Sequence, residues 1–285
     1  MLFRSEPMKI ALCNEVLQPM PFVRQCEFAA ALGYDGLELA PFTLSDDPHL
    51  MIPQERAAIR RAAAAAGIGI TSLHWLLLAP KGLSITSPDD DVRARTVDVM
   101  RRLVDLCVDL DGRVLVHGSP GQRQVPPNET RETAIARARE CFAAVAEHAQ
   151  AAGVTYCIEP LSRHETMVIN TLAEAAAIVD AIGNPALRTM LDTSAAGRAE
   201  DAPIAALIAR WLPTGHIAHV QVNDSSRRGP GEGEDRFAPV FAALKRLGYG
   251  GVVAVEPFKY VPDGPGCAAR SIGYIRGILE SLGDQ

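Results

Sequence analysis

The sequence contains no apolar run long enough to span a membrane, and none of its six cysteines belongs to a CxxC pair. Its first residues, MLFRSEPMKI, lack the apolar core and the cleavage site of a secretory signal peptide. Most of the cysteines lie inside apolar periodic segments, which is typical of buried thiols in a reducing compartment and not of a disulfide framework. We therefore expect a cytoplasmic protein without a membrane partner, in which residues 1–7 form a short leader before the first strand.

The chain also lacks an excess of basic residues and the short motifs of several enzyme classes. Its formal net charge is −6 at pH 7, so nucleic acid and anionic membranes are not expected partners. No GxSxG, GK[ST] or GxGxxG motif occurs in the setting that its chemistry needs. This argues against a serine hydrolase, a nucleotide hydrolase and an NAD-dependent enzyme.

What the sequence does contain is eight short β-branched runs that alternate with longer segments rich in alanine and leucine. Hydrophobic residues make up 48% of the chain, enough for a large core, and no linker or low-complexity segment divides it. Eight βα units predict a parallel sheet that closes into a (β/α)8 TIM barrel. We predict one barrel domain over residues 1–285, with strands at 8–14, 35–40, 68–75, 113–118, 154–160, 187–193, 217–223 and 251–257 and helices at 21–32, 53–66, 90–110, 130–152, 171–182, 202–212, 237–247 and 267–282.

Several helix boundaries follow from individual residues. Pro53 and Pro203 suit the first turn of a helix, where a backbone N–H is not needed. Thr171 precedes an apolar run and has Glu174 three residues later, which predicts a capping box. The stretch 262–266 contains two prolines and no lysine, so we interpret it as a structural turn before the last helix rather than as a phosphate site.

Four consecutive predicted strands end in a side chain that can bind a metal: Glu159, Asp192, Gln221 and Glu256. In such barrels the carboxyl ends of the strands meet at one mouth, where catalytic groups are found. One acidic residue alone would more often be a helix cap or a loop acid, but four at the same place in consecutive strands favour a shared site. Three carboxylates and one amide oxygen suit Mn²⁺ or Mg²⁺ better than a structural zinc, with Co²⁺ as a third candidate.

The segments around these residues carry a family resemblance. IEPLSRHETMVINTLAEAAAIVD, MLDT, HVQVND with RRGPGEG, and VAVEPF resemble the xylose isomerase-like TIM-barrel superfamily, and within it the D-tagatose/D-psicose 3-epimerase group. The resemblance implies one divalent ion held by Glu159, Asp192, Gln221 and Glu256. It also implies a small carbohydrate-like substrate and a homo-oligomer, either a dimer or a tetramer.

The same resemblance implies how the reaction proceeds. Glu159 and Glu256 would form an acid/base pair that faces opposite sides of the reacting carbon of a ketose-type sugar. One removes a proton next to the carbonyl and the other returns a proton to the opposite face, while the metal stabilises the enediolate. Glu165 and Arg227 match residues that bind substrate in the family.

Two positions depart from the epimerase pattern. Gln221 stands where the epimerases usually have a histidine ligand, and glutamine here also resembles the 3-dehydroshikimate dehydratase branch of the superfamily. Ala195 stands where a substrate-binding histidine is usual, which removes one polar contact and widens the mouth. His219 lies two residues before Gln221 on the same strand face, so we interpret it as a core histidine deeper in the barrel.

Other residues near the predicted mouth have two interpretations each. His74 and His117 end strands three and four and either contact substrate or pack in the core. Trp75 is expected to point outward from His74 and to pack against helices. Glu38 ends strand two and either binds a substrate hydroxyl or pairs with a core arginine; we favour the site.

The sequence therefore predicts a metal-dependent sugar epimerase or isomerase. The alternative is a metal-dependent dehydratase of a keto-polyol or 3-dehydroshikimate-like substrate, because removal of the same proton can end in loss of water. A catalytically silent sugar-binding barrel is a third hypothesis, opposed by the presence of both Glu159 and Glu256. An endonuclease of the same superfamily is disfavoured because its histidine-rich zinc set is absent and the chain is acidic.

Overall fold

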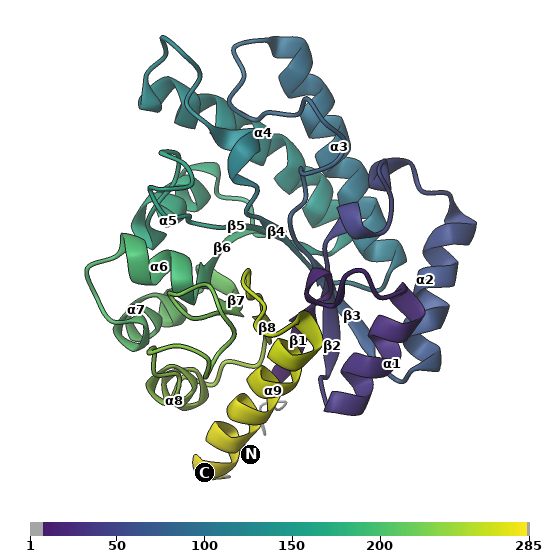
Figure 1. Ribbon diagram of the computed structural model, residues 1–285. Coiled ribbons are helices and arrows are strands. Elements are labelled where there is room, and N and C mark those ends of the chain that lie inside the picture. Colours follow the sequence, from purple (N-terminus) through teal and green to yellow (C-terminus); the bar gives the residue numbers. More distant parts are fainter. Residues whose placement is uncertain (1–7, 284–285) are drawn as a thin grey trace, which may run out of the picture.

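Eight parallel strands close into a barrel at the centre of the molecule, and the helices surround it (Figure 1). The strands are β1 (Lys9–Cys13), β2 (Gly36–Leu39), β3 (Gly69–Leu73), β4 (Val114–His117), β5 (Thr155–Ile158), β6 (Leu187–Asp192), β7 (Ile217–Val222) and β8 (Val252–Val255). They pair in chain order, and β8 closes the barrel against β1. The predicted TIM barrel is confirmed. This computed structural model describes residues 8–283, so the leader expected at 1–7 lies outside the described residues.

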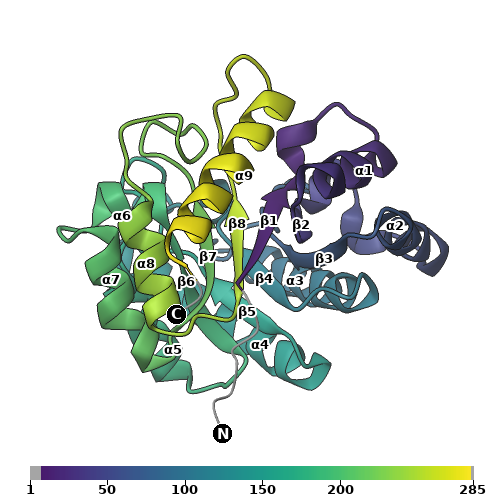
Figure 2. The same cartoon turned by 90° about the horizontal axis from the view of Figure 1, so that it is seen from below.

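Every predicted helix is present, with ends that differ from the prediction by three residues at most. They are α1 (Phe22–Leu32), α2 (Pro53–Ala65), α3 (Asp90–Asp109), α4 (Arg131–Ala152), α5 (Leu172–Ile182), α7 (Ile204–Trp211), α8 (Ala238–Arg246) and α9 (Gly264–Ser281). Viewed from below in Figure 2, α1 and α2 lie on one side of the strands and α5, α7 and α8 on the other. The predicted cap of α5 is present, because Thr171 Oγ1 accepts a hydrogen bond from the Glu174 backbone N–H at 3.2 Å.

Two helical segments differ from the prediction for reasons of capping. Helix α6 (Thr193–Ala199) was not predicted; it begins directly after β6 because Asp192 Oδ1 accepts the Ala195 backbone N–H at 2.6 Å. Helix α9 begins three residues earlier than predicted, since Asp263 caps the backbone N–H of Gly266 at 2.7 Å. Short 3-10 helices occupy several connections: η1 (Asn14–Leu17), η2 (Pro41–Thr43), η3 (Pro48–Leu50), η4 (Pro120–Arg123) and η5 (Leu212–Thr214).

The barrel strands carry both apolar and polar buried side chains. Val116, Cys157 and Met190 form a separate apolar cluster on β4, β5 and β6. Glu38 on β2 and His219 on β7, both with 0% exposure, meet to form a polar layer. The main hydrophobic core lies outside the strands, between the barrel and its helices. The polar layer is thus placed directly beneath the mouth, where it can act on the groups above it.

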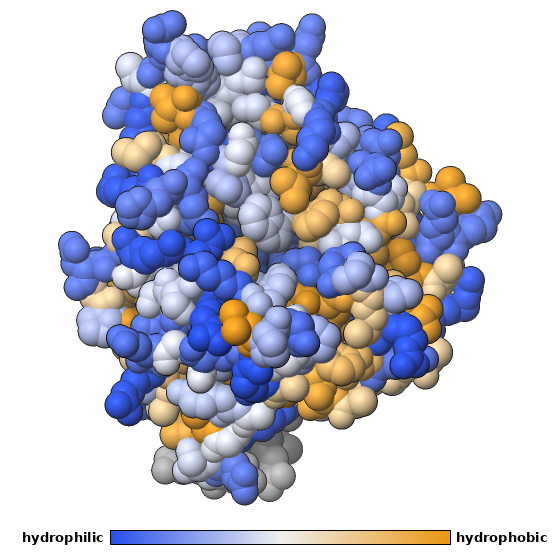
Figure 3. Space-filling view, in the orientation of Figure 1, coloured by the Kyte–Doolittle hydropathy of each residue, from blue (hydrophilic) through white to orange (hydrophobic). Residues whose placement is uncertain are grey.

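The described surface is mixed in character. On the face in Figure 3, apolar side chains gather on the side of α1 and α2, whereas hydrophilic ones dominate the side of α5 to α8. All six cysteines are free and buried, as expected. Among the described helices, none combines the length and apolarity needed to cross a membrane. The cytoplasmic location and the homo-oligomer stay predictions.

Candidate active site

Three carboxylates converge where β5, β6 and β8 end. One side-chain oxygen each from Glu159, Asp192 and Glu256 lies within 4.8 Å of the other two. All three residues are buried, with exposures of 6%, 3% and 3%. Gln221 is paired with Asp192 across β6 and β7, so its side chain joins the same edge of the barrel. The four residues predicted as metal ligands are therefore brought together.

The hydrogen bonding of these groups fits a divalent ion. Asp192 Oδ2, Gln221 Oε1 and Glu256 Oε2 are buried, and within residues 8–283 they have no hydrogen-bond partner. Buried oxygens without donors are costly unless a cation or water satisfies them. Because all of these atoms are oxygens, the donor set matches hard ions such as Mg²⁺ and Mn²⁺.

The electrostatics of the three carboxylates also favour a bound cation. Burial, together with the charges of Glu256 and Asp192, raises the pKa of Glu159 well above its ordinary value. Burial also raises the pKa of Glu256 to about 8, against a lowering hydrogen bond from His74, and that of Asp192 to about 7. Three buried like charges repel one another, so the cluster either retains protons near neutral pH or takes up a cation.

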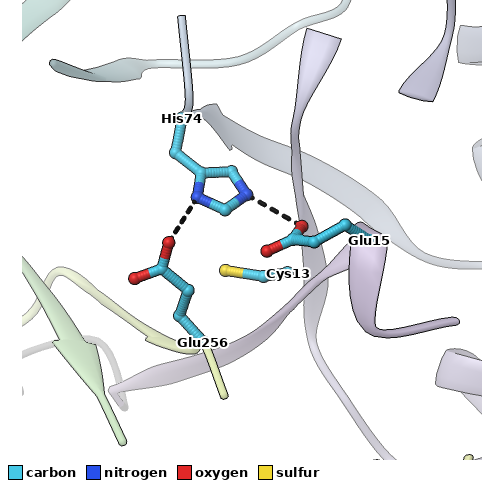
Figure 4. Close-up of side chains that lie close together, drawn as sticks. All are labelled: Cys13, Glu15, His74 and Glu256. Carbon is cyan, nitrogen blue, oxygen red and sulfur yellow. Dashed lines mark hydrogen bonds and ion pairs between the residues drawn. The ribbon is translucent and has the colours of Figure 1, made fainter. Parts of the chain in front are cut away.

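A second chain of charged groups supports Glu256 from the side (Figure 4). The ring of His74 lies between two carboxylates, with Nδ1 2.9 Å from Glu256 Oε1 and Nε2 3.0 Å from Glu15 Oε2. Burial alone would lower the pKa of His74, but Glu15 and Glu256 raise it well above 6.5. The charged imidazole can then donate to both carboxylates, which holds Glu256 by one oxygen and leaves the other without a partner.

His74 also belongs to a second group of possible metal ligands with Cys13, Glu15 and Glu256 (Figure 4). Both ring nitrogens of His74 are already paired with carboxylates. The histidine therefore has no free nitrogen for an ion, so the carboxylate cluster is the better candidate for a cation. His74 reaches the site through Glu256; the predicted direct contact with substrate stays a prediction.

A narrow pocket opens over the carboxylates. Trp75 and Phe258 form an aromatic wall, with ring centroids 6.2 Å apart in an edge-to-face arrangement. The other lining residues are Gly118, Pro120, Glu159, Leu161, Glu165 and Glu256. The prediction that Trp75 points outward is wrong: β3 ends at Leu73, and Trp75 has a φ of 51°, so strand alternation no longer sets its direction.

Two residues that matched substrate-binding positions lie at this mouth. Glu165 lines the pocket, and its Oε2 accepts a hydrogen bond from Ser162 Oγ at 2.7 Å. The guanidinium of Arg227 lies 4.6 Å from the centroid of the Phe258 ring, a cation–π distance. Both positions suit contact with a polar substrate in the pocket, and that contact stays a prediction.

Residues 26–278 match the family described as Xylose isomerase-like TIM barrel. The chain belongs to this family. The family resemblance predicted from the sequence is thereby confirmed.

Several relatives with known names are sugar 3-epimerases. Within the xylose isomerase-like family, the chain is 30% identical to the D-psicose 3-epimerase of Ruminiclostridium cellulolyticum over 239 residues. This aligned segment covers 81% of this chain and 76% of that protein. It is 31% identical over 227 residues to the L-ribulose 3-epimerase of Mesorhizobium japonicum, covering 78% and 72%. A crystal structure of D-psicose 3-epimerase in the presence of D-fructose has a TM-score of 0.82 at 24% identity, covering 95% of this chain and 99% of that one. At that identity the structural likeness shows the fold.

One predicted contact residue of this xylose isomerase-like barrel faces away from the mouth. His117 is fully buried, with Nδ1 2.8 Å from Tyr156 Oη and its ring edge-to-face with Phe142 of α4. Burial lowers the pKa of His117 to about 3. The prediction that His117 contacts substrate is wrong, and its packing interpretation holds, because the last residue of β4 points outward to the helices.

Glu38 also lies elsewhere than predicted. It is fully buried inside the barrel, where Oε1 accepts from Gln221 Nε2 at 2.6 Å and Oε2 lies 2.7 Å from His219 Nε2. Burial by itself would raise the pKa of Glu38, but His219 and His74 hold it below its ordinary value. The carboxylate is fully buried and both of its oxygens are engaged by side chains of the barrel, which contradicts the predicted substrate contact, and no arginine among residues 8–283 is its partner. The interpretation of His219 as a core histidine is confirmed.

Two residues that were not predicted from the sequence also shape the site. Arg123 is fully buried in η4, and its Nη2 donates to the backbone oxygen of Glu159 at 2.6 Å. Nothing in its local sequence distinguishes it from a surface arginine. A Cβ atom on Gly118 would lie 1.7 Å from Glu159 Oε2, so this glycine, directly after β4, makes room for the carboxylate. A glycine directly after a predicted strand end, as in His117-Gly118, is a sequence signal for a close approach of another group at the mouth.

The raised carboxyl pKa values predict how stability depends on pH. The folded, metal-free protein binds more protons than the unfolded chain, whose carboxyl pKa values are about 4, so stability is lost as pH rises through the folded values near 7 and 8. In EDTA, the free energy of unfolding should fall by about 1–3 kcal/mol between about pH 6 and about pH 8.5. Urea unfolding followed by circular dichroism measures this.

Two comparisons make the result specific. Replacing Glu256→Gln removes one titrating group, so the decline should be smaller in that variant. Saturating Mn²⁺ should abolish most of the decline, because the cation takes the place of the protons. A stability that stays level or rises across this range would contradict the assignment of buried, mutually repelling carboxylates.

Proposed function

We propose that this protein is a divalent-metal-dependent ketose-type epimerase in which Glu159 and Glu256 exchange protons with the substrate. The observation that carries the proposal is the convergence of Glu159, Asp192 and Glu256 within 4.8 Å, with the oxygen of Gln221 unpartnered among the described residues. The curated relatives are D-psicose and L-ribulose 3-epimerases, which supports a small sugar as the substrate.

The ion would be held by Glu159, Asp192, Gln221 and Glu256. Their oxygen donors favour Mn²⁺ or Mg²⁺, with Co²⁺ as a third candidate. When bound, a divalent ion stabilises the negative charge that develops on the substrate oxygens.

The two glutamates would perform the proton transfers. They extend from β5 and β8 on different sides of the pocket floor, so each can face one side of a reacting carbon. Burial raises the pKa of both glutamates in the metal-free protein, and a carboxylate removed from water is a stronger base than an exposed one, which suits groups that accept and return a proton. Epimerisation requires this combination, with removal on one face and return on the other.

The rest of the pocket would bind and orient the sugar. Glu165 and Arg227 offer an acceptor and a donor for hydroxyl groups at the mouth. The wall formed by Trp75 and Phe258 offers an apolar surface for the carbon face of the ring and excludes water from the glutamates. The homo-oligomer, a dimer or a tetramer, is retained as part of the proposal.

A dehydratase is the second candidate function. Ala195 stands where the epimerases usually have a substrate-binding histidine, and it is 4% exposed with its N–H capped by Asp192. Gln221 and Ala195 therefore both stand at positions where the epimerases usually have a histidine. The first proton transfer would be the same in both reactions, and only the fate of the intermediate separates them.

Isotope incorporation tests the proposal directly. The protein should be incubated with Mn²⁺ and D-psicose or L-ribulose in D₂O. We expect the C3 epimer with one deuterium on the reacting carbon, measured by NMR and mass spectrometry, because the proton returned comes from a glutamate that exchanges with solvent. A product lighter by one water would favour the dehydratase. Binding of Mn²⁺ without conversion of either D-psicose or L-ribulose would favour a silent sugar-binding barrel.

Replacement of the two glutamates tests their roles. Glu159→Gln and Glu256→Gln keep the shape of the side chain but cannot take up a proton, so each should lower kcat by about 10²–10⁴-fold. Glu147→Gln, at an exposed position on α4, is the matched control and should keep full activity. Activity of either site variant close to that of the control would refute the acid/base assignment.

A further inference from the structure

The side chain of Gln221 differs from the three carboxylates because the two ends of its amide are chemically different. Only the oxygen can bind a cation; the NH₂ group is a donor and would repel one. Gln221 is fully buried, and its Nε2 donates to Glu38 Oε1 at 2.6 Å. Its Oε1 has no partner in the part of the chain that the structure describes. The amide is therefore turned with its NH₂ group toward Glu38.

The opposite orientation would satisfy the carboxylates without any cation. If the amide were reversed, its NH₂ group would be available to Asp192 Oδ2 and Glu256 Oε2, which are buried and without donors among residues 8–283. The negative charge of the cluster favours that reversal. Reversal would also turn the Gln221 oxygen against the carboxylate of Glu38 and break the 2.6 Å hydrogen bond. Glu38 therefore opposes the reversal of the Gln221 amide that the carboxylate cluster favours.

Glu38 is itself held in place from several elements. Ser72 Oγ on β3 donates to Oε2, and His219 Nε2 on β7 lies 2.7 Å from the same oxygen. Cys13 Sγ on β1 contacts Oε1 at 3.4 Å. With partners on three other strands, the carboxylate has little freedom to move away from Gln221. Its acceptor-only oxygens can take only the NH₂ end of the amide.

We propose that Glu38 is a positioning residue that sets the orientation of the Gln221 amide, so that the oxygen and not the NH₂ group faces the cation site. Ser72 and His219 act through Glu38 by holding its carboxylate. The inference rests on the proposed function for the presence of a divalent ion. It explains how a glutamine can serve at a position where the epimerases usually have a histidine.

Metal affinity in three variants of Glu38 tests the proposal. Mn²⁺ binding to the metal-free protein should be measured by calorimetry and by electron paramagnetic resonance. Glu38→Leu removes the acceptor and should weaken Mn²⁺ binding by about 10–100-fold, the usual effect of losing a partner of a metal ligand. Glu38→Gln keeps the shape of the side chain but replaces one acceptor oxygen with an NH₂ group, so it no longer fixes which end of the Gln221 amide it accepts; it should also weaken Mn²⁺ binding, but by less than Glu38→Leu. Glu38→Asp keeps the charge but shortens the reach, so about a tenfold loss is expected.

A double-mutant cycle with Gln221→Ala separates positioning from general support of the barrel. With no amide to orient, Glu38→Leu should change Mn²⁺ affinity little in the Gln221→Ala background. An equally large loss in that background would overturn the proposal, since Glu38 would then act on the site by another route. Thermal unfolding in EDTA identifies variants that do not fold, and Glu38→Asp carries the test if Glu38→Leu is one of them.

The outcomes separate this inference from the proposed function. If the unchanged protein and Glu38→Leu, or Glu38→Asp in its place, bind Mn²⁺ equally well, the inference is overturned and the proposed function stands. If the unchanged protein does not bind Mn²⁺, both are overturned. A loss in Glu38→Leu that is smaller in Glu38→Gln and absent in the Gln221→Ala background supports the inference.

Discussion

The mutual repulsion of three buried carboxylates is the constraint on which this site depends. Glu159, Asp192 and Glu256 are each removed from water and brought within 4.8 Å of one another. Burial and like charge both penalise the ionised forms, so the fold tolerates the cluster only with protons or a cation present. A closed parallel barrel imposes this crowding, because its strand ends all open at one mouth.

The surrounding residues compensate for the charge without closing the site. His74, backed by Glu15, supports one oxygen of Glu256, and Arg123 is buried beneath the backbone of Glu159. Neither interaction covers the oxygens that converge. The protein thus stabilises the outer sides of the carboxylates and leaves their inner sides free, which is the arrangement that a cation-binding site requires.

Gln221 is the one proposed ligand whose side chain has to be oriented. A neutral histidine binds a cation through the ring nitrogen that carries no proton, whereas a glutamine binds one only through its oxygen, and so only when its amide is turned the right way. The inner polar layer of β1, β2, β3 and β7 provides that direction through Glu38. Below Gln221, the Glu38 carboxylate lies 2.7 Å from His219 Nε2, and both residues are fully buried.

The amino-acid sequence by itself determined the eight βα units and the four strand-end residues proposed as metal ligands, because strand period, helix caps and strand ends are properties of neighbouring residues. It did not distinguish His74 from His117, which both end predicted strands, nor place Trp75, whose direction follows from a left-handed backbone beyond β3. Glu38 meets Gln221 across 183 positions, and His74 meets Glu256 across 182. Only closure of the barrel brings such residues together, so the supporting network was decided by the tertiary structure.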